Sequence, residues 1–572
     1  MHRTGAQVLW HTLVREGVET VFGYPGGAIL PAYDALLEFP IRHVLVRHEQ
    51  CAVHMADGFA RAGGGVGVVI ATSGPGATNL VTGIATAMLD SSPIVCITGQ
   101  VASHVMGTDA FQEIDITGIT IPITKHNFLV TRADDIGPTL RRAFQIARSG
   151  RPGPVLVDIT KDAQRAQAQD EAEWAPSPLP TQLHESGFDA DELQRSAELI
   201  RQAKRPLILA GRGVILSGAT MELRAFAERT NTPVAVTLLG IGALPASHAL
   251  NLGMMGMHGE AWVNHAIQEA DLLLALGMRF DDRVTGDPKT YAPAARKVHA
   301  DIDRAEIGKN VPVDAALVGD LSSTLGALLD AVEPAAHDEW LSHIEALKGD
   351  VAVRDIQQLP DSSHFYAAHA IHDIWRLTKG RALVATDVGQ HQMWEAQYYH
   401  HESPSSLITS GGLGTMGFGL PAAIGAKLAR PDDEVWAIVG DGGFQMTQAE
   451  LTTLAQEQIK IIVAIINNGY LGMVRQWQEF FYGGRYSATP IKSPDFVKLA
   501  DAHGLTGLRV DARKDVEDTV RQARELPGAV VIDFQVEQED SVYPLVPADA
   551  SLGDMIRRPD GAVLVETGSD PG

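Results

Sequence analysis

The chain has 572 residues, a length that fits three or four domains of roughly 150 residues each. Its 46 basic and 70 acidic residues give a formal net charge of −24, which argues against nucleic acid or an anionic membrane as the main partner. Hydrophobic residues make up 45% of the chain and charged residues 20%, as in soluble proteins with large cores. A small anionic substrate would therefore need basic side chains gathered at its site.

The cysteine content and the opening residues indicate the compartment. Cys51 and Cys96 lie in different segments and can build neither a disulfide scaffold nor a thiolate metal site, which fits a reducing cytoplasm. The first residues read as an amphipathic helix, without the apolar core of a signal peptide. There is no run of 18 apolar residues that could span a membrane. We expect a soluble, cytoplasmic protein.

Three α/β blocks follow one another, separated by weakly apolar connectors at residues 162–187 and 332–365, the second of them partly helical. Each block contains continuous Val, Ile and Leu runs, which are typical of strands buried on both faces, so we predict three parallel sheets. Ligands of such sheets bind at the carboxyl ends of the strands. The predicted strands lie at residues 18–25, 41–49, 65–72, 93–100, 152–159, 206–213, 233–240, 271–280, 296–303, 381–389, 434–443, 460–469 and 528–536.

Glu49 lies at the junction of a predicted strand and the apolar helix that follows it. A carboxyl group entering a core should have a raised pKa, which would let it exchange a proton near neutral pH. The plainer interpretation is a glutamate that complements the positive end of the helix dipole. The residues alone favour this plainer interpretation.

The stretch GLGTMG at residues 412–417 matches the dinucleotide-binding pattern G-x-G-x-x-G. That pattern requires a preceding strand and an acidic residue about 20 positions later. Only Leu407 and Ile408 could form the strand, although Asp441 is nearly at the acidic position. The match is ambiguous on these residues.

The strongest local signal lies at residues 434–474, which read as strand, GDG (440–442), helix, strand and Asn467-Asn468. The two strands should be neighbours joined by one crossover helix. Carboxylate and amide oxygens at adjacent strand ends suit Mg²⁺, and the glycines let backbone N–H groups approach a phosphate. Either motif alone would be a tight turn, but the pair, with 24 residues between Gly442 and Asn467, predicts a diphosphate and magnesium site.

With this pair, further segments between residue 4 and about residue 556 resemble the catalytic subunit of the acetohydroxyacid (acetolactate) synthases, a family of thiamin-diphosphate-dependent enzymes. The segments that carry the resemblance are, in order, VFGYPGGAILPAYDAL, RHEQCAVHMADGFARA, TSGPGATNL, GTDAFQEIDITGIT, GMRFDDRVTGD, GQHQMW, SGGLGTMGFGLPAAIGA and GMVRQWQ.

The resemblance implies an α/β fold of three doubly wound parallel-sheet domains, the central one Rossmann-like. The implied organisation is an N-terminal pyrimidine-binding domain at 1–165, a linker at 166–188, a central FAD-associated domain at 189–335, a second linker at 336–364, a C-terminal diphosphate and Mg²⁺ domain at 365–545, and a tail at 546–572 that forms a possible lid and is then disordered.

The same resemblance implies a role for each motif. The GLGTMG loop would hold the aminopyrimidine of thiamin diphosphate: the Gly414 carbonyl would accept from its 4′-amino group, and Met416 would bend the cofactor. Glu49 would protonate its N1′ atom. The further residues implied for this cofactor are Pro75, Asn79, Gln390, His391, Gly442, Gly443, Asn468 and Met473, and those implied for Mg²⁺ are Asp441, Asn468 and the carbonyl of Tyr470.

Two more sets of residues follow from the resemblance. A histidine at a strand end, such as His391, is more often a polar turn residue, and the Met473, Val474 and Trp477 stripe could equally be core packing. The residues implied for FAD are Arg151, Gly211, Gly213, Met257, His258, Arg279, Asp281, Arg283, Asp301 and Asp320. Those implied for the substrate are Phe111, Gln112, Lys125, Arg279, Met473, Val474 and Trp477, with Arg279 as a fixed positive charge for a keto-acid carboxylate.

The implied activity is that of a transferase. Such an enzyme would decarboxylate pyruvate and transfer the hydroxyethyl carbanion to pyruvate or 2-ketobutyrate. This is the first common step of branched-chain amino acid biosynthesis. Glu49 and Asp441 lie in different blocks, and the resemblance places them in different subunits of a homodimer or homotetramer, with a possible small regulatory subunit. The alternatives are a pyruvate oxidase-like enzyme, another thiamin-dependent decarboxylase, or a non-catalytic paralogue.

Overall fold

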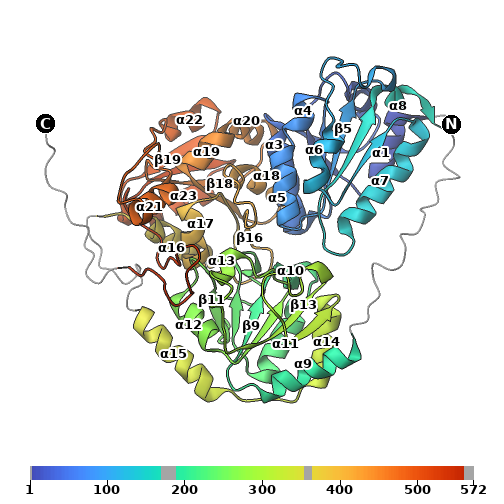
Figure 1. Ribbon diagram of the computed structural model, residues 1–572. Helices are drawn as coiled ribbons and strands as arrows, with labels where there is room; N and C mark the ends of the chain where they lie inside the picture. The colour runs from blue at the N-terminus through green and yellow to red at the C-terminus, as the bar shows by residue number, and fades with distance from the viewer. Residues whose placement is uncertain (1–2, 169–188, 353–363, 559–572) are drawn as a thin grey trace. The chain divides into compact units, whose positions relative to one another are not determined.

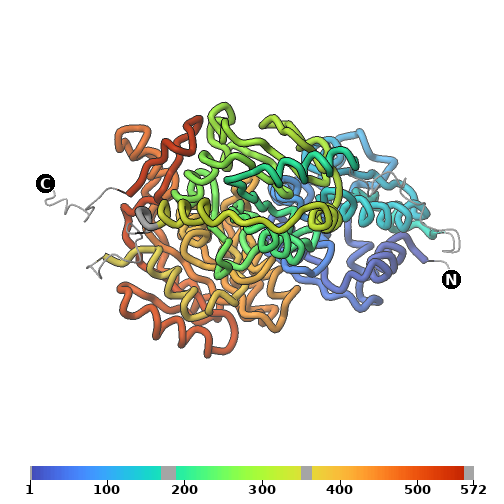
Figure 2. Tube along the Cα trace, turned by 90° about the horizontal axis from the view of Figure 1, so that it is seen from below, coloured from blue at the N-terminus to red at the C-terminus, as the bar shows by residue number. Residues whose placement is uncertain are grey.

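The computed structural model describes residues 3–168, 189–352 and 364–558. Its three six-stranded sheets follow one another along the chain, from blue through green to red (Figure 1; Figure 2), and every strand pair within them is parallel. The prediction of three doubly wound parallel-sheet domains is confirmed. A short antiparallel pair, β1 (Arg3–Thr4) with β8 (Gln167–Ala168), was not predicted.

The first sheet has the strand order β3-β2-β4-β5-β7-β6. Successive residues of its central strand enter different cores: Val69 packs in one cluster, and Val68 and Ile70 pack in the cluster on the opposite face. Burial on both faces explains the unbroken apolar run. The strands are β2 (Thr20–Gly23), β3 (Arg42–Leu45), β4 (Gly67–Ala71), β5 (Ile94–Gln100), β6 (His126–Val130) and β7 (Val155–Thr160), and the helices are α1 (Gly5–Arg15), α2 (Leu30–Leu36), α3 (Glu49–Phe59), α4 (Pro75–Thr78), α5 (Val81–Leu89), α6 (Ile116–Thr120), α7 (Ala133–Arg148) and α8 (Lys161–Arg165).

The second sheet has the order β11-β10-β9-β12-β13-β14. Here Leu207 and Leu209 face one core, while Ile208 faces the other. The strands are β9 (Pro206–Ala210), β10 (Val234–Val236), β11 (Asn251–Met254), β12 (Leu272–Leu276), β13 (Arg296–Asp301) and β14 (Ala315–Val318), and the helices are α9 (Ala190–Gln202), α10 (Arg212–Leu216), α11 (Thr220–Thr230), α12 (Ala261–Glu269), α13 (Asp282–Thr285), α14 (Leu321–Ala331) and α15 (Asp338–Ala352).

The third sheet has the order β16-β15-β17-β18-β20-β19, so the strands that precede GDG and Asn467-Asn468 are neighbours, as predicted. The strands are β15 (Leu383–Thr386), β16 (Leu407–Ile408), β17 (Val435–Gly440), β18 (Ile462–Asn467), β19 (Thr506–Val510) and β20 (Val530–Gln535), and the helices are α16 (Ala367–Thr378), α17 (Gln390–Tyr398), α18 (Gly419–Ala429), α19 (Asp441–Thr447), α20 (Leu451–Glu457), α21 (Gly472–Phe481), α22 (Phe496–Ala502) and α23 (Val516–Glu525).

The first and third domains pack through α3 and α18, which lie side by side (Figure 1). Glycines allow this close approach: a Cβ on Gly58 would overlap the Ala422 carbonyl, and one on Gly425 would overlap the Met55 carbonyl. Any side chain at these two positions would therefore push the helices apart. This contact fixes the axis of the helix that begins at Glu49.

The crossover between β17 and β18 differs from the single predicted helix. It consists of α19, a 3₁₀ turn at Gln448–Glu450 and α20, because Thr447 departs from helical geometry with φ −131° and ψ 10°. The other short 3₁₀ segments are Ser103–Val105, Ile121–Ile123, Leu238–Gly240, Arg304–Glu306 and Arg513–Asp515, and Ala60–Gly64 is a π-helix.

The domain boundaries stay predictions. The linker predicted at 166–188 lies almost wholly outside the described residues, and so does the disordered end predicted for the tail. The second predicted linker contains α15, in line with its partly helical prediction. Within the described tail, Leu545 and Ile556 form an isolated antiparallel bridge. No helix in the described ranges is long and apolar enough to cross a membrane.

Candidate active site

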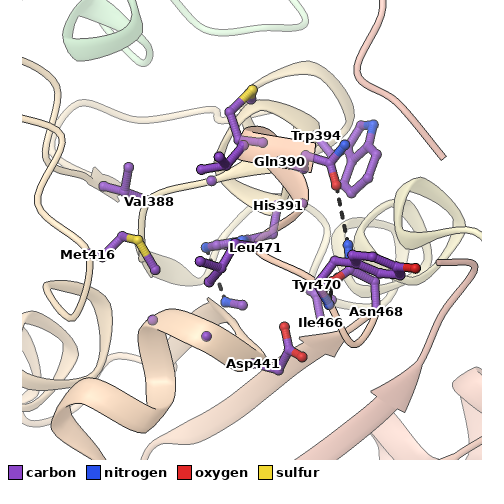
Figure 3. Close-up of a pocket in the computed structure, with 17 residues that line it drawn as sticks. Val388, Gln390, His391, Trp394, Met416, Asp441, Ile466, Asn468, Tyr470 and Leu471 are labelled. Atoms are coloured by element: carbon purple, nitrogen blue, oxygen red, sulfur yellow. Dashed lines mark hydrogen bonds between the residues drawn. The ribbon is translucent and has the colours of Figure 1, made fainter. Parts of the chain in front are cut away.

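A pocket opens at the carboxyl ends of β15, β17 and β18 (Figure 3). This is the edge at which parallel α/β sheets bind ligands. In the close-up Val388 and Met416 lie on one side, and Gln390, Asn468 and Tyr470 on the other. The lining residues are Val388, Gly389, Gln390, His391, Trp394, Met416, Gly440, Asp441, Gly442, Gly443, Ile466, Asn468, Tyr470, Leu471, Gly472, Met473 and Val474.

Asp441 is the first residue of α19 and follows β17 directly. Its Oδ2 accepts hydrogen bonds from the Gly469 N–H and the Ser493 hydroxyl, each at 3.1 Å. Burial raises the pKa of this carboxyl to about 6, against the opposing effect of these donors. The site therefore holds a desolvated carboxylate, which a bound cation would stabilise.

Asn468 lies one residue beyond β18 and directly precedes Gly469, whose N–H donates to Asp441. Its Nδ2 donates to Gln390 Oε1 at 3.2 Å, and its Oδ1 accepts from the Tyr470 N–H at 3.1 Å. Gln390 is held in turn by Gln476, whose Oε1 accepts from Gln390 Nε2 at 3.0 Å. The amide chain fixes the orientation of Asn468 and links the start of α17 to α21.

His391 packs against the first glycine of GDG. Its Nε2 accepts from the Gly440 N–H at 3.1 Å, and a Cβ on Gly440 would lie only 2.8 Å from the imidazole. Burial lowers the pKa of His391 to about 3, so the ring is neutral. This histidine is therefore a buried partner of the glycine turn and lines the pocket as a neutral group.

The GLGTMG loop enters the same pocket through Met416. Gly414 and Gly417 adopt φ of +67° and +88°, a region that favours glycine. The Asp387 carboxylate accepts from the Gly417 N–H at 2.9 Å and from the Gly419 N–H at 3.2 Å, so it holds the end of the loop. The loop is thus a backbone scaffold placed beside the GDG turn, and the dinucleotide interpretation is not needed.

The other end of this loop is held by the first domain. Asp90 accepts from the Gly411 N–H at 3.1 Å and from the Gly412 N–H at 2.7 Å. Arg61 is buried and donates to Asp90 at 2.8 Å and to the Thr409 carbonyl at 2.6 Å. Buried carboxylates therefore hold both ends of the loop, whose Met416 lines the pocket.

Glu49 lies in the first domain at the start of the predicted helix, where it is the first residue of α3. Its Oε2 accepts from Asn79 Nδ2 at 2.9 Å, and a Cβ on Gly76 would approach its Oε1 at 3.3 Å. Pro75 opens the short helix that ends in Asn79. None of these residues is among those that line the pocket, all of which belong to residues 388–474.

The charge of the pocket limits what it can bind. Among its 17 lining residues, all described, none is lysine or arginine, and the one formal charge is the Asp441 carboxylate. A diphosphate placed here needs a cation, and carboxylate, amide and carbonyl oxygens are ligands that Mg²⁺ prefers. The described residues contain no group of three or more His, Cys, Asp or Glu at metal-binding separation, so a soft transition-metal site is not formed. The residues fit a magnesium diphosphate.

Comparison with known proteins shows the family of the chain. Three family models of thiamine pyrophosphate enzymes match: the N-terminal TPP binding domain at residues 3–119, the central domain at 193–328 and the C-terminal TPP binding domain at 387–534. The acetolactate synthase large subunit of Corynebacterium glutamicum is 49% identical over 96% of this chain and 90% of its own length. The isozyme 2 large subunit of Escherichia coli is 45% identical over 97% and 99%, and the Mycobacterium leprae acetolactate synthase is 50% identical over 96% and 89%.

The chain belongs to the acetolactate synthase family of thiamine pyrophosphate enzymes.

In this member of the acetolactate synthase family, the predicted substrate residues lie in different surroundings. Phe111 is 87% exposed, and Val474, which lines the pocket, is 49% exposed. Gln112 has φ +60° beside Gly74. Trp477 lies on α21 and meets Phe481 edge to face at 5.3 Å. Met473 also lines the pocket, which places the start of the stripe at the site.

Lys125 is engaged within the first domain. Its Nζ donates to the carbonyls of Ile146 and Ser149, each at 2.5 Å, at the C-terminal end of α7. Burial lowers the pKa of this ammonium to about 8. A role in binding a substrate carboxylate would require Lys125 to leave these two carbonyls.

Most of the residues predicted for FAD gather at the carboxyl edge of the second sheet. Gly211 and Gly213 pack against Gly277, which follows β12, and Asp301 ends β13. Arg283 lies 3.7 Å from the Met257 sulfur, and Arg279 pairs with Asp281 at 3.3 Å. Asp281 and Asp320 cap helices α13 and α14. His258 forms a hydrogen bond with the Pro544 carbonyl, and burial lowers its pKa to about 4. Arg151 is the exception, because it lies in the first domain and donates to the Ser91 hydroxyl.

Several residues that shape the site carried no sequence signal of their own. These residues are Asp387 and Asp90, which lie outside the family segments, and Arg61 and Gln476, which lie within them but were not predicted to act at the site. Asp387 stands four residues from His391 at a strand end, the place where parallel sheets bind ligands, so its position was the one available clue. The other three act through contacts between segments that are far apart in the chain.

Proposed function

We propose that this chain is the catalytic subunit of an acetolactate synthase. It would decarboxylate pyruvate and join the two-carbon unit to a second 2-keto acid, giving 2-acetolactate from pyruvate or 2-aceto-2-hydroxybutyrate from 2-ketobutyrate. The observation that carries the proposal is the pocket in which Asp441 and Asn468 end neighbouring strands beside the GLGTMG loop, with no basic side chain among its lining residues. Near 50% identity to acetolactate synthases over almost the whole chain supports the same activity.

The proposed cofactor arrangement assigns each group of residues one task. Asp441, Asn468 and the Tyr470 carbonyl would hold Mg²⁺, and Gly442 and Gly443 at the start of α19 would present backbone N–H groups to the diphosphate. Gln390 and His391 would complete that end, and the carbonyl of Gly414 and the side chain of Met416 would contact the pyrimidine. Thiamin diphosphate, when bound, supplies the electron sink for decarboxylation and carbon–carbon bond formation.

Glu49 would hold and exchange the proton at the pyrimidine N1′, with its carboxylate oriented by Asn79. Because the pocket is lined only by residues 388–474, we propose that Glu49 reaches it from a second copy of the chain. The minimal active unit would then be a homodimer with two shared sites.

The central domain would bind FAD at the carboxyl edge of its sheet, where Gly211, Gly213 and Asp301 lie. Arg279 would offer a fixed positive charge to a keto-acid carboxylate, and Trp477 would contact the alkyl group of the second substrate. Two of the relatives are named large subunits, and we propose that this chain likewise associates with a small regulatory subunit.

One assay separates the proposal from its rivals. Purified protein is incubated with pyruvate, Mg²⁺ and thiamin diphosphate, with and without FAD, and acetolactate, hydrogen peroxide and acetaldehyde are measured under air and under nitrogen. We expect acetolactate under both atmospheres. Oxygen-dependent peroxide would indicate an oxidase, acetaldehyde alone would indicate a simple decarboxylase, and no turnover despite bound cofactor would indicate a non-catalytic paralogue.

A further inference from the structure

One buried carboxylate of the third domain contacts the backbone just before Glu49. Glu450 is fully buried, and its Oε1 accepts from the Arg47 N–H at 2.9 Å and from the His48 N–H at 3.2 Å. Its Oε2 accepts from the Thr453 hydroxyl at 2.6 Å. The carboxylate thus binds the two residues that lead into Glu49, across a separation of about 400 positions in the chain.

This carboxylate belongs to the short 3₁₀ turn that separates α19 from α20 in the crossover between β17 and β18. Glu450 ends the 3₁₀ turn that interrupts the two helices, and the geometry of Thr447 marks where α19 stops. Burial raises the pKa of Glu450, so an ionised side chain here needs the backbone and hydroxyl donors that surround it. Cys51, in the first turn of α3, also bonds the Glu450 side chain.

The contact lies at the N-terminus of α3, where backbone N–H groups have no partners within the helix. His48 caps this end with its own ring, which accepts from the Gln50 N–H at 3.1 Å. A carboxylate at this end also interacts favourably with the helix dipole. The contact with α18 through Gly58 and Gly425 fixes the second half of α3. Glu450 fixes its N-terminal end by binding the N–H groups of Arg47 and His48.

We propose that Glu450 is a positioning residue for Glu49: by binding the N–H groups of Arg47 and His48 it sets the direction in which the Glu49 carboxylate leaves the first turn of α3. The inference rests on the proposed function of Glu49. Glu450 itself touches no cofactor, because it is absent from the residues that line the pocket. It acts through the backbone.

The proposal differs from the simpler one in which Glu450 only stabilises the contact between domains. A purely stabilising role predicts a lower melting temperature with unchanged chemistry in the protein that stays folded. A positioning role predicts that cofactor affinity is kept while the proton exchange attributed to Glu49 slows. Displacing a catalytic group by about 1 Å can cost on the order of 100-fold in rate.

The test compares Glu450→Ala and Glu450→Gln with wild type in the full-length protein. In Glu450→Gln one amide oxygen can still accept from both N–H groups, so this variant is the conservative rescue. The matched control is Asp271→Ala in the central domain, where a carboxylate accepts from the consecutive N–H groups of Lys204 and Arg205, each at 2.9 Å. Asp271 precedes β12 at the edge of the sheet opposite to the proposed FAD residues.

Two readouts are measured. Hydrogen exchange in the cofactor-free protein should show that the amides of Arg47 and His48 exchange at least about 10-fold faster in Glu450→Ala and close to wild type in Glu450→Gln. Exchange of the C2 proton of bound thiamin diphosphate should slow by about 10-fold or more in Glu450→Ala, with its dissociation constant changed less than about 3-fold. Asp271→Ala should change neither.

The proposal is overturned if Glu450→Ala keeps both exchange rates, or if Asp271→Ala slows C2-proton exchange as much at an equal loss of stability. It is equally overturned if Glu450→Gln behaves as Glu450→Ala in both readouts. If wild type itself shows no C2-proton exchange, the proposed function of the site fails, whereas the amide readout still reports on the Glu450 contact.

Discussion

At the scale of single residues, Glu49 illustrates how one side chain fits two interpretations. It opens α3, where a glutamate favours the helix dipole, and it is also oriented by Asn79, a contact that dipole stabilisation does not require. Replacement by glutamine keeps the shape and an acceptor for Asn79 but removes the exchangeable proton.

We predict that Glu49→Gln binds thiamin diphosphate normally while acetolactate formation falls by about 100-fold or more, the usual contribution of a positioned acid–base group. Calorimetric titration of the cofactor and a steady-state assay with pyruvate check the two halves. Wild-type turnover in this variant would remove Glu49 from the proton transfer.

Replacing Asp441 by asparagine should raise the stability of the metal-free protein but abolish binding of the cofactor. The folded-state pKa of Asp441, about 6, lies above the unfolded value, so the native state binds the extra proton, and ionisation lowers the stability of the metal-free protein as pH rises from about 4 to 6. Asp441→Asn should therefore raise the unfolding free energy of the metal-free protein at pH 7 by about 3 kcal/mol, since the pKa lies about two units above its ordinary value of 3.8 and each unit corresponds to about 1.4 kcal/mol.

The same Asp441→Asn variant should lose Mg²⁺-dependent binding of thiamin diphosphate. Urea unfolding at pH 7 and pH 4 measures the first effect, and calorimetry with and without Mg²⁺ measures the second. The stability gain should shrink at pH 4, where the native carboxyl of the wild type is protonated. A variant that is less stable at pH 7, or that still binds the cofactor with magnesium, would contradict this assignment.

The buried polar residues at and around the site differ in how far the sequence predicts their roles. Asp441 and Asn468 follow apolar strands directly, so their position was readable from local pattern and general rules of parallel sheets. Glu450 and Asp90 were not readable, because each acts on backbone groups more than 300 positions away. A contact between a buried carboxylate and a loop far away in the chain produces no periodic pattern in the sequence, so it cannot be predicted from local residues.

At the scale of elements, the strands that the sequence missed are all at sheet edges. Besides β1 and β8, which form a two-stranded sheet of their own, the strands that were not predicted are β6, β11, β14, β16 and β19, and the order of each six-stranded sheet places them at its ends. An edge strand has one neighbour and is partly exposed, as the patterns of β6 and β19 illustrate, so its sequence lacks a continuous apolar run. The central strands are buried on both faces, so each has the continuous apolar run from which it was predicted.

The contact between α3 and α18 yields a stability prediction. Gly425→Ala places a methyl group against the Met55 carbonyl and should lower the free energy of unfolding by about 1–3 kcal/mol, the usual cost of overpacking. The matched control is Gly326→Ala in α14, where a Cβ meets nothing within 4 Å. That substitution should instead stabilise by about 0.5–1 kcal/mol, the difference in helix propensity. Urea unfolding followed by circular dichroism measures both, and equal effects would show that the packing of α3 on α18 does not restrict this position.

At the scale of the whole molecule, the proposed reaction needs two carboxylates that the fold assigns to different domains. Glu49 belongs to the first and Asp441 to the third, and the pocket around Asp441 takes no lining residue from the first domain. Within one chain, α3 and α18 join these domains through a glycine-mediated contact away from the pocket lining. Each site would therefore combine the first domain of one copy with the third domain of another.

Mixing two inactive variants tests this arrangement directly. When Glu49→Gln and Asp441→Asn proteins are dissociated and reassembled together, half of the dimers are mixed, and each mixed dimer contains one site with both native carboxylates and one with neither. Activity should then recover to about a quarter of wild type, because one of two sites is restored in half of the dimers. Reassembly of either variant alone is the control and should stay inactive. If both carboxylates of a site came from the same chain, every site would keep one defect and the mixture would show no recovery.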